Sequence, residues 1–178
     1  MKKVLAICGS TRIQSANLGV IRCVEQMLSN EVELEMYNEL SLLPHFNPDL
    51  DKGEAPEIVE RFRNKIRSAD GVLICTPEYV FSLPGVLKNA IEWCVSTTIF
   101  SEKPTALITA SAAGSAAHES LQLVMKTIYA DARSETQLLI QGAKGKVTNE
   151  GRITDAATAE QLKNLASAFV KQLNEQIK

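Results

Sequence analysis

Unbroken apolar runs alternate with segments of helical periodicity along this chain. Residues 4–8 are apolar without interruption, which is typical of a strand covered by helices on both faces of a parallel sheet. Residues 16–29 place apolar side chains at helical spacing, so we expect an amphipathic helix there. Residues 32–36 alternate apolar and acidic side chains, which predicts a strand nearer the edge of the sheet.

The same alternation continues to the end of the sequence. Residues 72–75, 105–110 and 137–140 predict three further strands, and helices are expected at 56–66, 84–94, 121–128 and from about 154 to 177. Five strands alternating with five helices predict a doubly wound α/β fold, because parallel neighbours need crossover connections. No linker separates two parts, so we expect one domain over residues 1–178. The aperiodic connection at 38–53 is a candidate substrate wall.

Composition and charge narrow the class of protein. The chain has 178 residues, of which 45% are hydrophobic and 22% charged, and this is the composition of an ordinary globular domain. A net charge of −2 gives no broad attraction to nucleic acid or to an anionic membrane, so neither is an expected partner. The apolar run at 4–8 is too short for a signal peptide and nothing approaches a membrane span, so we expect a cytoplasmic protein.

The cysteines and histidines do not form a recognisable metal or disulfide pattern. The cysteines lie within apolar segments and form no Cys-x-x-Cys pair, so we interpret them as buried thiols in a reducing compartment. His45 and His118 are far apart, and neither has a second ligand at helical spacing. We therefore expect no metal site.

Ligands of doubly wound folds bind beyond the carboxyl ends of the strands, and this rule selects three loops: 9–17, 76–83 and 110–115. The first loop combines short polar side chains with Arg12 just before a helix, and such a set can satisfy the oxygens of a phosphate. A turn with Ser15 as helix N-cap and Arg12 in solvent is an equally acceptable interpretation. The Gly-x-Gly-x-x-Gly and P-loop signatures do not occur, and residues 142–146 only imitate the second.

The other two loops carry weaker signals. Tyr79 and Phe81 stand between prolines and could present flat apolar surface to a planar ring, although both could equally be core aromatics. Residues 111–115 are small enough for their backbone N–H groups to approach a ligand closely.

Together these loops resemble those of the NADPH-dependent FMN reductase family, which includes quinone, azo-dye and chromate reductases. The matching residues are Gly9-Ser10-Thr11-Arg12 with Ser15 and Asn17, and Pro77-Glu78-Tyr79 with Ser82, Pro84, Gly85, Leu87, Lys88, Asn89, Ala90, Ile91 and Trp93. The resemblance implies a flavodoxin-like sheet with strand order 2-1-3-4-5. It also implies bound FMN, with NADPH or NADH as co-substrate.

Carried over residue by residue, the resemblance assigns three groups of cofactor-binding residues. The phosphate group comprises Ser10, Thr11, Arg12, Ser15, Ala16 and Asn17, the ring border comprises Pro77, Glu78, Tyr79 and Val80, and the third loop contributes Ser111, Ala113 and Gly114. The family usually has Gly-Gly in that third loop, whereas this chain has Ala112 and Ala113. The resemblance places these two added methyl groups near the pyrimidine edge of the ring, where they would alter the contacts with the cofactor.

The implied activity is an oxidoreductase in which hydride passes from NAD(P)H to FMN and on to a small acceptor: a quinone, an azo compound, a metal oxyanion or free flavin. No side-chain nucleophile or base is required. We expect residues 111–115 and the following helix N-terminus to stabilise negative charge on the ring. Lys88, Glu92 and Trp93 receive no catalytic role. The resemblance further implies a homodimer or homotetramer. Alternatives are a flavodoxin-type electron carrier and a relative without flavin that serves as a binding protein.

Overall fold

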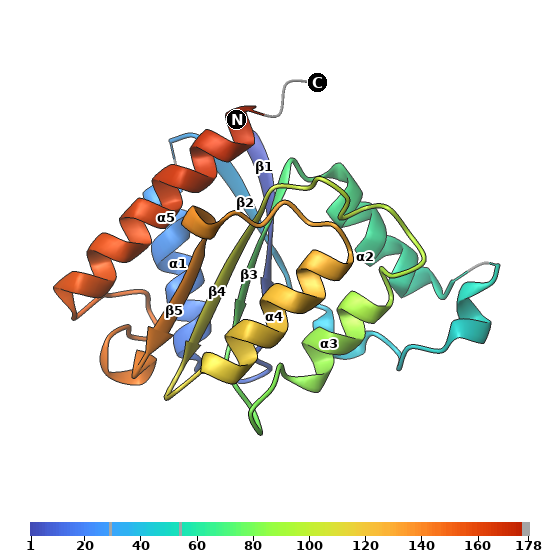
Figure 1. Ribbon diagram of the computed structural model, residues 1–178, viewed down its shortest axis with the longest axis horizontal. Helices are drawn as coiled ribbons and strands as arrows, with labels where there is room; N and C mark the ends of the chain where they lie inside the picture. The colour runs from blue at the N-terminus through green and yellow to red at the C-terminus, as the bar shows by residue number, and fades with distance from the viewer. Residues whose placement is uncertain (29, 54, 176–178) are drawn as a thin grey trace.

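The computed structural model describes residues 1–28, 30–53 and 55–175. It contains a five-stranded parallel sheet in the order β2-β1-β3-β4-β5 (Figure 1), which confirms the expected fold. The strands are β1 (Lys2–Cys8), β2 (Val32–Tyr37), β3 (Gly71–Thr76), β4 (Thr105–Ser111) and β5 (Gln137–Gln141). Strand β3 is buried along its whole length, whereas β2 at the edge is buried only in part, as the two kinds of sequence pattern predict.

Two layers of helices enclose the sheet (Figure 1). One face is covered by α1 (Ala16–Leu28) and α5 (Ala156–Glu175), and the other by α2 (Glu57–Ser68), α3 (Gly85–Glu92) and α4 (Ser115–Thr127). Each layer forms its own hydrophobic core against the strands. The apolar stripes that the sequence shows at helical spacing therefore face the sheet.

Element boundaries differ from the sequence expectations in a few places. Helix α4 begins at Ser115, six residues before the first apolar position that predicted it, because its first three residues are small and give no apolar period. Four short 3-10 helices were not expected: η1 (Leu40–Leu42), η2 (Pro48–Asp51), η3 (Ser134–Thr136) and η4 (Ala143–Gly145). The predicted ends of the first and last helices, at Ser29 and Ile177, lie outside the described residues.

The connection at residues 38–53 packs against α3. The side-chain amide of Asn89 donates to the carbonyl of Pro44 at 2.9 Å and accepts from the backbone N–H of Phe46 at 2.7 Å. The indole of Trp93 also donates to Pro44, at 2.7 Å, and Trp93 is fully buried. Trp93 is therefore a core residue.

A buried arginine joins three segments in the same layer. Arg63 on α2 has a side chain only 6% exposed, and it pairs with the equally buried Asp51 at 2.6 Å and with Glu60 at 2.7 Å. Its Nε also donates to the carbonyl of Trp93 at 2.8 Å, just beyond the end of α3. Arg63 thus fixes residues 48–51 and α3 to helix α2.

All five strands are parallel and therefore end at one rim of the sheet. Cys8 of β1 pairs with Cys75 of β3, Thr76 pairs with Thr109 of β4, and Ser111 pairs with Gln141 of β5. The loops that follow these strands are therefore brought together, as the topology rule requires. The four cysteines are buried free thiols, and burial raises the pKa of the Cys75 thiol well above its ordinary value. Over the residues described, no helix is both long and apolar enough to cross a membrane.

Candidate functional site

The loops at this rim surround a cavity of about 830 Å³, which falls within the range of small-molecule and cofactor sites. Most of the predicted cofactor-binding residues line it: Ser10, Arg12, Ser15, Ala16, Asn17, Pro77, Tyr79 and Ser111. The remaining predicted residues, Thr11, Glu78, Val80, Ala113 and Gly114, do not. The connection at 38–53 also contributes no residue, so it is not a wall of this cavity.

The first loop presents buried hydroxyls and an exposed arginine. The hydroxyl of Ser15 accepts from the backbone N–H of Asn17 at 3.2 Å, so Ser15 does cap α1, and the hydroxyl of Ser10 accepts from the N–H of Arg12 at 3.4 Å. Both serines are buried, and each hydroxyl still has its own hydrogen to donate. Arg12 is exposed in the cavity wall and forms no ion pair with the described residues. The helix cap at Ser15 therefore does not rule out an anion site at the same loop.

Asn17 has a role that the sequence did not reveal. Its side-chain N–H donates to the carbonyl of Ala110 at 3.1 Å, and its side-chain oxygen accepts from the thiol of Cys75 at 3.3 Å. The side chain therefore ties the start of α1 to the ends of β3 and β4. Its amide is turned inward, so any contact it makes with a phosphate would use the backbone.

Glu78 connects the second loop to the third. Its backbone N–H donates to the hydroxyl of Ser111 at 3.2 Å, and its carboxylate accepts from the backbone N–H of Ala117 at 3.0 Å. A carboxylate at the N-terminus of α4 is stabilised by the helix dipole. Glu78 thus positions Tyr79 without lining the cavity, and it shares the positive end of α4 with any charge that a ligand would bring there.

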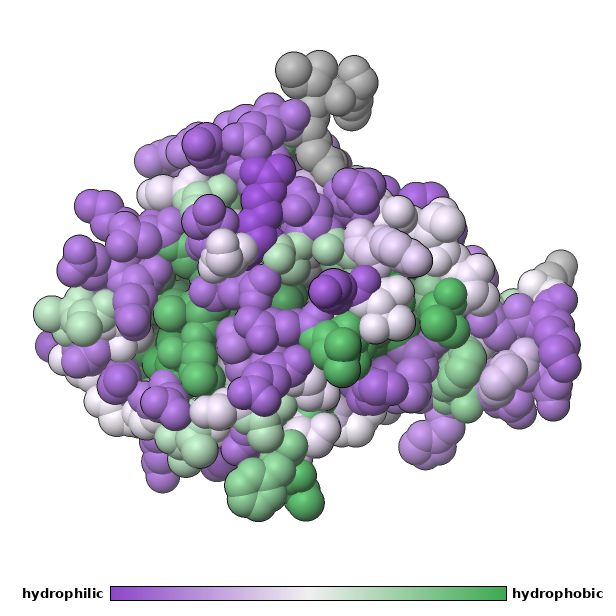
Figure 2. All heavy atoms as spheres, in the orientation of Figure 1, coloured by the Kyte–Doolittle hydropathy of each residue, from purple (hydrophilic) through white to green (hydrophobic). Residues whose placement is uncertain are grey.

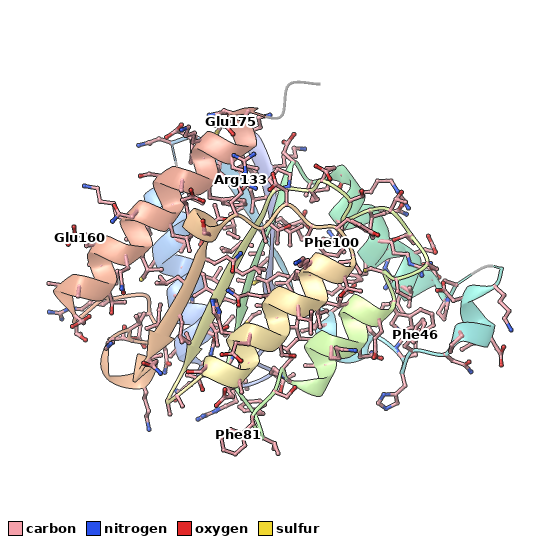
Figure 3. All side chains as sticks on the ribbon, viewed as in Figure 1. Phe46, Phe81, Phe100, Arg133, Glu160 and Glu175 are labelled. Atoms are coloured by element: carbon pink, nitrogen blue, oxygen red, sulfur yellow. The ribbon has the colours of Figure 1, made fainter. Side chains whose placement is uncertain are left out.

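The second loop ends in a tight turn of unusual conformation. Tyr79 and Ser82 exchange backbone hydrogen bonds of 3.0 and 3.1 Å, and the two residues between them, Val80 and Phe81, both have positive φ, at 51° and 55°. This conformation suits Asn-Gly and is unfavourable for a β-branched residue. Val80 is 94% exposed and Phe81 81% exposed, so the interpretation of Phe81 as a core residue is wrong. Figure 3 shows Phe81 pointing away from the protein, and Figure 2 shows a hydrophobic knob at the same place.

The third loop reaches the cavity only through its first residues. Ser111 and Ala112 line the wall, whereas Gly114 is buried behind them with φ of +90°. A Cβ at Gly114 would lie 2.9 Å from Leu139 and 3.2 Å from Thr109. A bulky substitution there would therefore strain the backbone and the packing together, so it would not isolate a contact with a ligand.

One wall of the cavity was missed by the sequence analysis. It is formed by the segment after β5 and contributes Gly142, Ala143, Lys144, Gly145, Val147, Thr148, Asn149 and Glu150. The segment lacks a hydrophobic period, and its glycine-lysine run does not match a P-loop. The signal that could have found it is topological, since the end of β5 lies at the same rim as the other loops.

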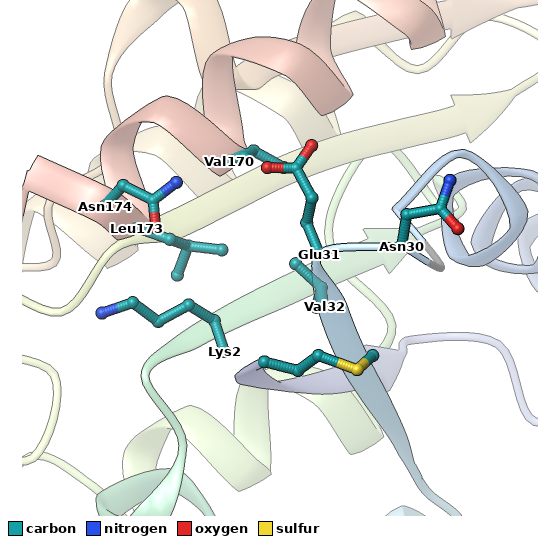
Figure 4. A pocket seen from close by; sticks show the side chains of 8 residues that line it. Lys2, Asn30, Glu31, Val32, Val170, Leu173 and Asn174 are labelled. Atoms are coloured by element: carbon teal, nitrogen blue, oxygen red, sulfur yellow. The ribbon is translucent and has the colours of Figure 1, made fainter.

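The opposite end of the sheet has a smaller hollow of about 410 Å³ (Figure 4). It is lined by residues from the start of β1, the segment into β2 and the end of α5. Its one cationic side chain among the described residues, Lys2, lies 4.0 Å from Asp70, and the carboxylate of Glu31 faces the same space. This charge pattern does not suit a phosphate, so the rim at the carboxyl ends carries the candidate site.

The fold and this site define a flavodoxin-like protein with a cavity suited to a phosphorylated ligand. The family model for NADPH-dependent FMN reductase matches residues 2–145. An NAD(P)H-dependent FMN reductase of Pseudomonas aeruginosa is 33% identical over 172 residues, covering 94% of this chain and 92% of the relative. An NAD(P)H:quinone oxidoreductase of Solanum tuberosum is 31% identical, covering 94% and 90%. The chain therefore belongs to the NADPH-dependent FMN reductase family.

A solved structure agrees with this assignment. FerB, a flavoenzyme NAD(P)H:(acceptor) oxidoreductase of Paracoccus denitrificans, has a TM-score of 0.84 and 28% identity, and the match covers 98% of both chains. The predicted family, fold and class of enzyme are thereby confirmed: an oxidoreductase that uses FMN and NAD(P)H.

Proposed function

We propose that the cavity at the carboxyl rim holds FMN, with its phosphate at the first loop and its ring toward Pro77, Tyr79 and Ser111. The donor set carries this proposal, because Arg12 and the hydroxyls of Ser10 and Ser15 meet at the N-terminus of α1. Guanidinium, hydroxyl and helix N–H groups together match a phosphate monoester. Among the predicted residues, Glu78 and Asn17 then act by positioning, and Thr11, Val80, Ala113 and Gly114 stay predictions.

Bound FMN supplies the redox chemistry, since its ring accepts hydride from NAD(P)H and returns electrons to an acceptor. The chain's own contribution is orientation. Glu78 fixes the Pro77–Tyr79 turn against the start of α4 through Ser111 and Ala117. Since no residue of α4 lines the cavity, stabilisation of negative charge on the ring by the N–H groups of its first turn stays a prediction.

The proposed acceptor is a quinone, as the name of the Solanum tuberosum relative suggests. The protein as purified should show flavin absorbance, and FMN should be released on denaturation at near one equivalent. NADPH added without oxygen should bleach the flavin, and a quinone should restore its colour with no added FMN. Azo compounds, a metal oxyanion and free FMN serve as comparison acceptors.

Two results would contradict this function. A colourless protein that takes up no FMN from excess would remove the cofactor site. A flavin that NADPH leaves oxidised, but that accepts single electrons from a protein donor, would instead favour the flavodoxin-type carrier. The proposed setting is one domain working in the reducing cytoplasm, in agreement with four buried free thiols.

The proposed assembly is a homo-oligomer that uses the Val80–Phe81 turn. Two residues with positive φ cost roughly 1–3 kcal/mol each in strain, and the exposed side chains gain no burial within the chain. A second subunit that covers this turn would offset the cost. Replacing both residues together (Val80→Asn, Phe81→Gly) should raise the free energy of unfolding of the monomer by about 1 kcal/mol or more. The same change should weaken association.

Sedimentation over a range of concentrations, combined with urea unfolding at low concentration, measures both effects. Leu42→Asn is the matched control, because Leu42 is also an exposed apolar residue but has a negative-φ setting away from the turn. If the doubly substituted protein associates like the parent and the control, the turn is not part of the interface.

A further inference from the structure

The segment between β5 and α5 is fixed against both sides of the candidate FMN site. At its start, the backbone N–H of Gly142 donates to the carbonyl of Ala112 in the third loop at 3.1 Å. Further on, Val147 and Ile153 form an antiparallel bridge, so residues 147–153 make a small hairpin. The segment is therefore attached at its start to the loop after β4, and it ends in a hairpin.

The hairpin rests on the first turns of α1. Arg22 donates to the carbonyl of Asn149 at 2.6 Å, and the thiol of Cys23 donates to the carbonyl of Gly151 at 2.7 Å. The carbonyl of Thr148 lies only 1.9 Å from the position that a Cβ would occupy on Gly19. This close approach places the hairpin backbone directly beside the helix start that carries the phosphate loop.

The cavity between the two walls has an uneven charge. Its lining contains two cations, Arg12 from the first loop and Lys144 from η4, and neither forms an ion pair with any described residue. The one lining carboxylate, Glu150, is engaged by its own hairpin. Hydrogen bonds from its own backbone N–H and from Thr148, with the charge of Arg22 nearby, hold the pKa of Glu150 below its ordinary value. Two cations and one carboxylate thus line the space, and neither cation forms an ion pair with the described part of the protein.

A phosphate monoester carries roughly two negative charges at neutral pH, and Arg12 alone balances about half of that charge. We propose that Lys144 is the second cation of the FMN phosphate site, so that the phosphate is held between the first loop and the segment after β5. This inference rests on the proposed FMN site and adds a residue from outside the loops that the family resemblance assigns.

The test measures how much of the flavin affinity depends on the phosphate. The FMN-loaded protein is equilibrated with excess riboflavin, which lacks the phosphate, and the displaced FMN is quantified after filtration. The result is the ratio of the riboflavin Kd to the FMN Kd. Lys144→Met should lower this ratio by about ten-fold, the lower end of what a charge-assisted hydrogen bond contributes, and Lys144→Arg should preserve it.

Lys146→Met is the matched control, because it removes the same charge two residues away on a side chain that does not line the cavity. Its ratio should equal that of the parent, whereas Arg12→Met should lower the ratio. If Arg12→Met lowers the ratio and Lys144→Met does not, the inference about Lys144 is wrong while the proposed site stands. If Lys144→Met and Lys146→Met lower the ratio equally, the effect is only the general positive charge near the site, and the inference about Lys144 is also wrong. If neither Arg12→Met nor Lys144→Met has an effect, the phosphate is not bound in this cavity.

Discussion

Replacing Arg63 by methionine should lower the free energy of unfolding by about 3–5 kcal/mol, the usual cost of removing one partner of a buried ion pair. The change removes the ion-pair partner of the Asp51 carboxylate, which is as buried as Arg63. It also removes the donor to the carbonyl of Trp93. Urea unfolding followed by circular dichroism, at matched FMN concentration, measures the loss. The control is Arg61→Met on the same helix, where both ion pairs are exposed and about 0–1 kcal/mol is expected.

The pH dependence of this loss provides a second readout. Burial raises the pKa of Asp51, but hydrogen bonds from Ser96 and Arg63 and the guanidinium charge outweigh it and hold this pKa below the ordinary value of 3.8. In the parent protein the contribution of Asp51 is therefore present at neutral pH and is lost as the pH falls through that lowered pKa. Without Arg63, burial raises the pKa instead, so the variant loses stability as the pH rises.

The gap in stability between parent and Arg63→Met should therefore be smaller near pH 4 than at pH 7. A gap that does not change with pH would mean that the loss comes from packing of the long side chain rather than from the stranded carboxylate.

Replacing Gly19 by alanine should destabilise the protein, although alanine is the better helix former by about 1 kcal/mol. The new Cβ would fall 1.9 Å from the carbonyl oxygen of Thr148, and this oxygen belongs to a hairpin fixed by Arg22 and Cys23. Overpacking of this kind costs about 1–3 kcal/mol and can cost more against backbone, so the clash outweighs the gain. Because the hairpin lines the cavity, FMN should also be released more readily on dilution.

Gly85→Ala is the control for Gly19→Ala. Gly85 is also helical, at the first position of α3, and a Cβ there meets nothing within 4 Å. The free energy of unfolding of Gly85→Ala should equal that of the parent or be slightly higher. Equal stability of the two variants in urea would disprove the close approach of the hairpin to α1.

The sheet could be predicted because the burial of its central strands is evident from their own residues. Strand β3 is apolar at nearly every position, and this pattern depends only on having helices on both faces. The loops of the site followed from topology, since parallel strands end at one rim. The direction of a polar side chain could not be predicted in the same way. Asn17 turns inward because the ends of β3 and β4 offer it partners, and those partners are distant in sequence.

Two further features run against local preferences. Val80 and Phe81 adopt a conformation that a β-branched and an aromatic residue rarely take, so propensity alone assigns them to the interior or to an ordinary turn. The hairpin at residues 147–153 has no hydrophobic period, and its position is set by the absence of a side chain at Gly19. Contacts of this kind, with residues distant in sequence, cannot be predicted from the sequence of the segment that they position.

The hairpin at residues 147–153 also has a consequence for how this protein could diversify. It follows the last residue matched by the family model, residue 145, yet it walls the same cavity. Hydrogen bonds attach the segment between β5 and α5 to α1 and to the third loop, and Ala143 and Val147 are buried in the core that α1 and α5 form against the strands. Transplanting this segment from a relative would therefore reshape the ligand compartment, and it would preserve the fold only where small or apolar residues stand at positions 143 and 147 and glycine stands at position 19.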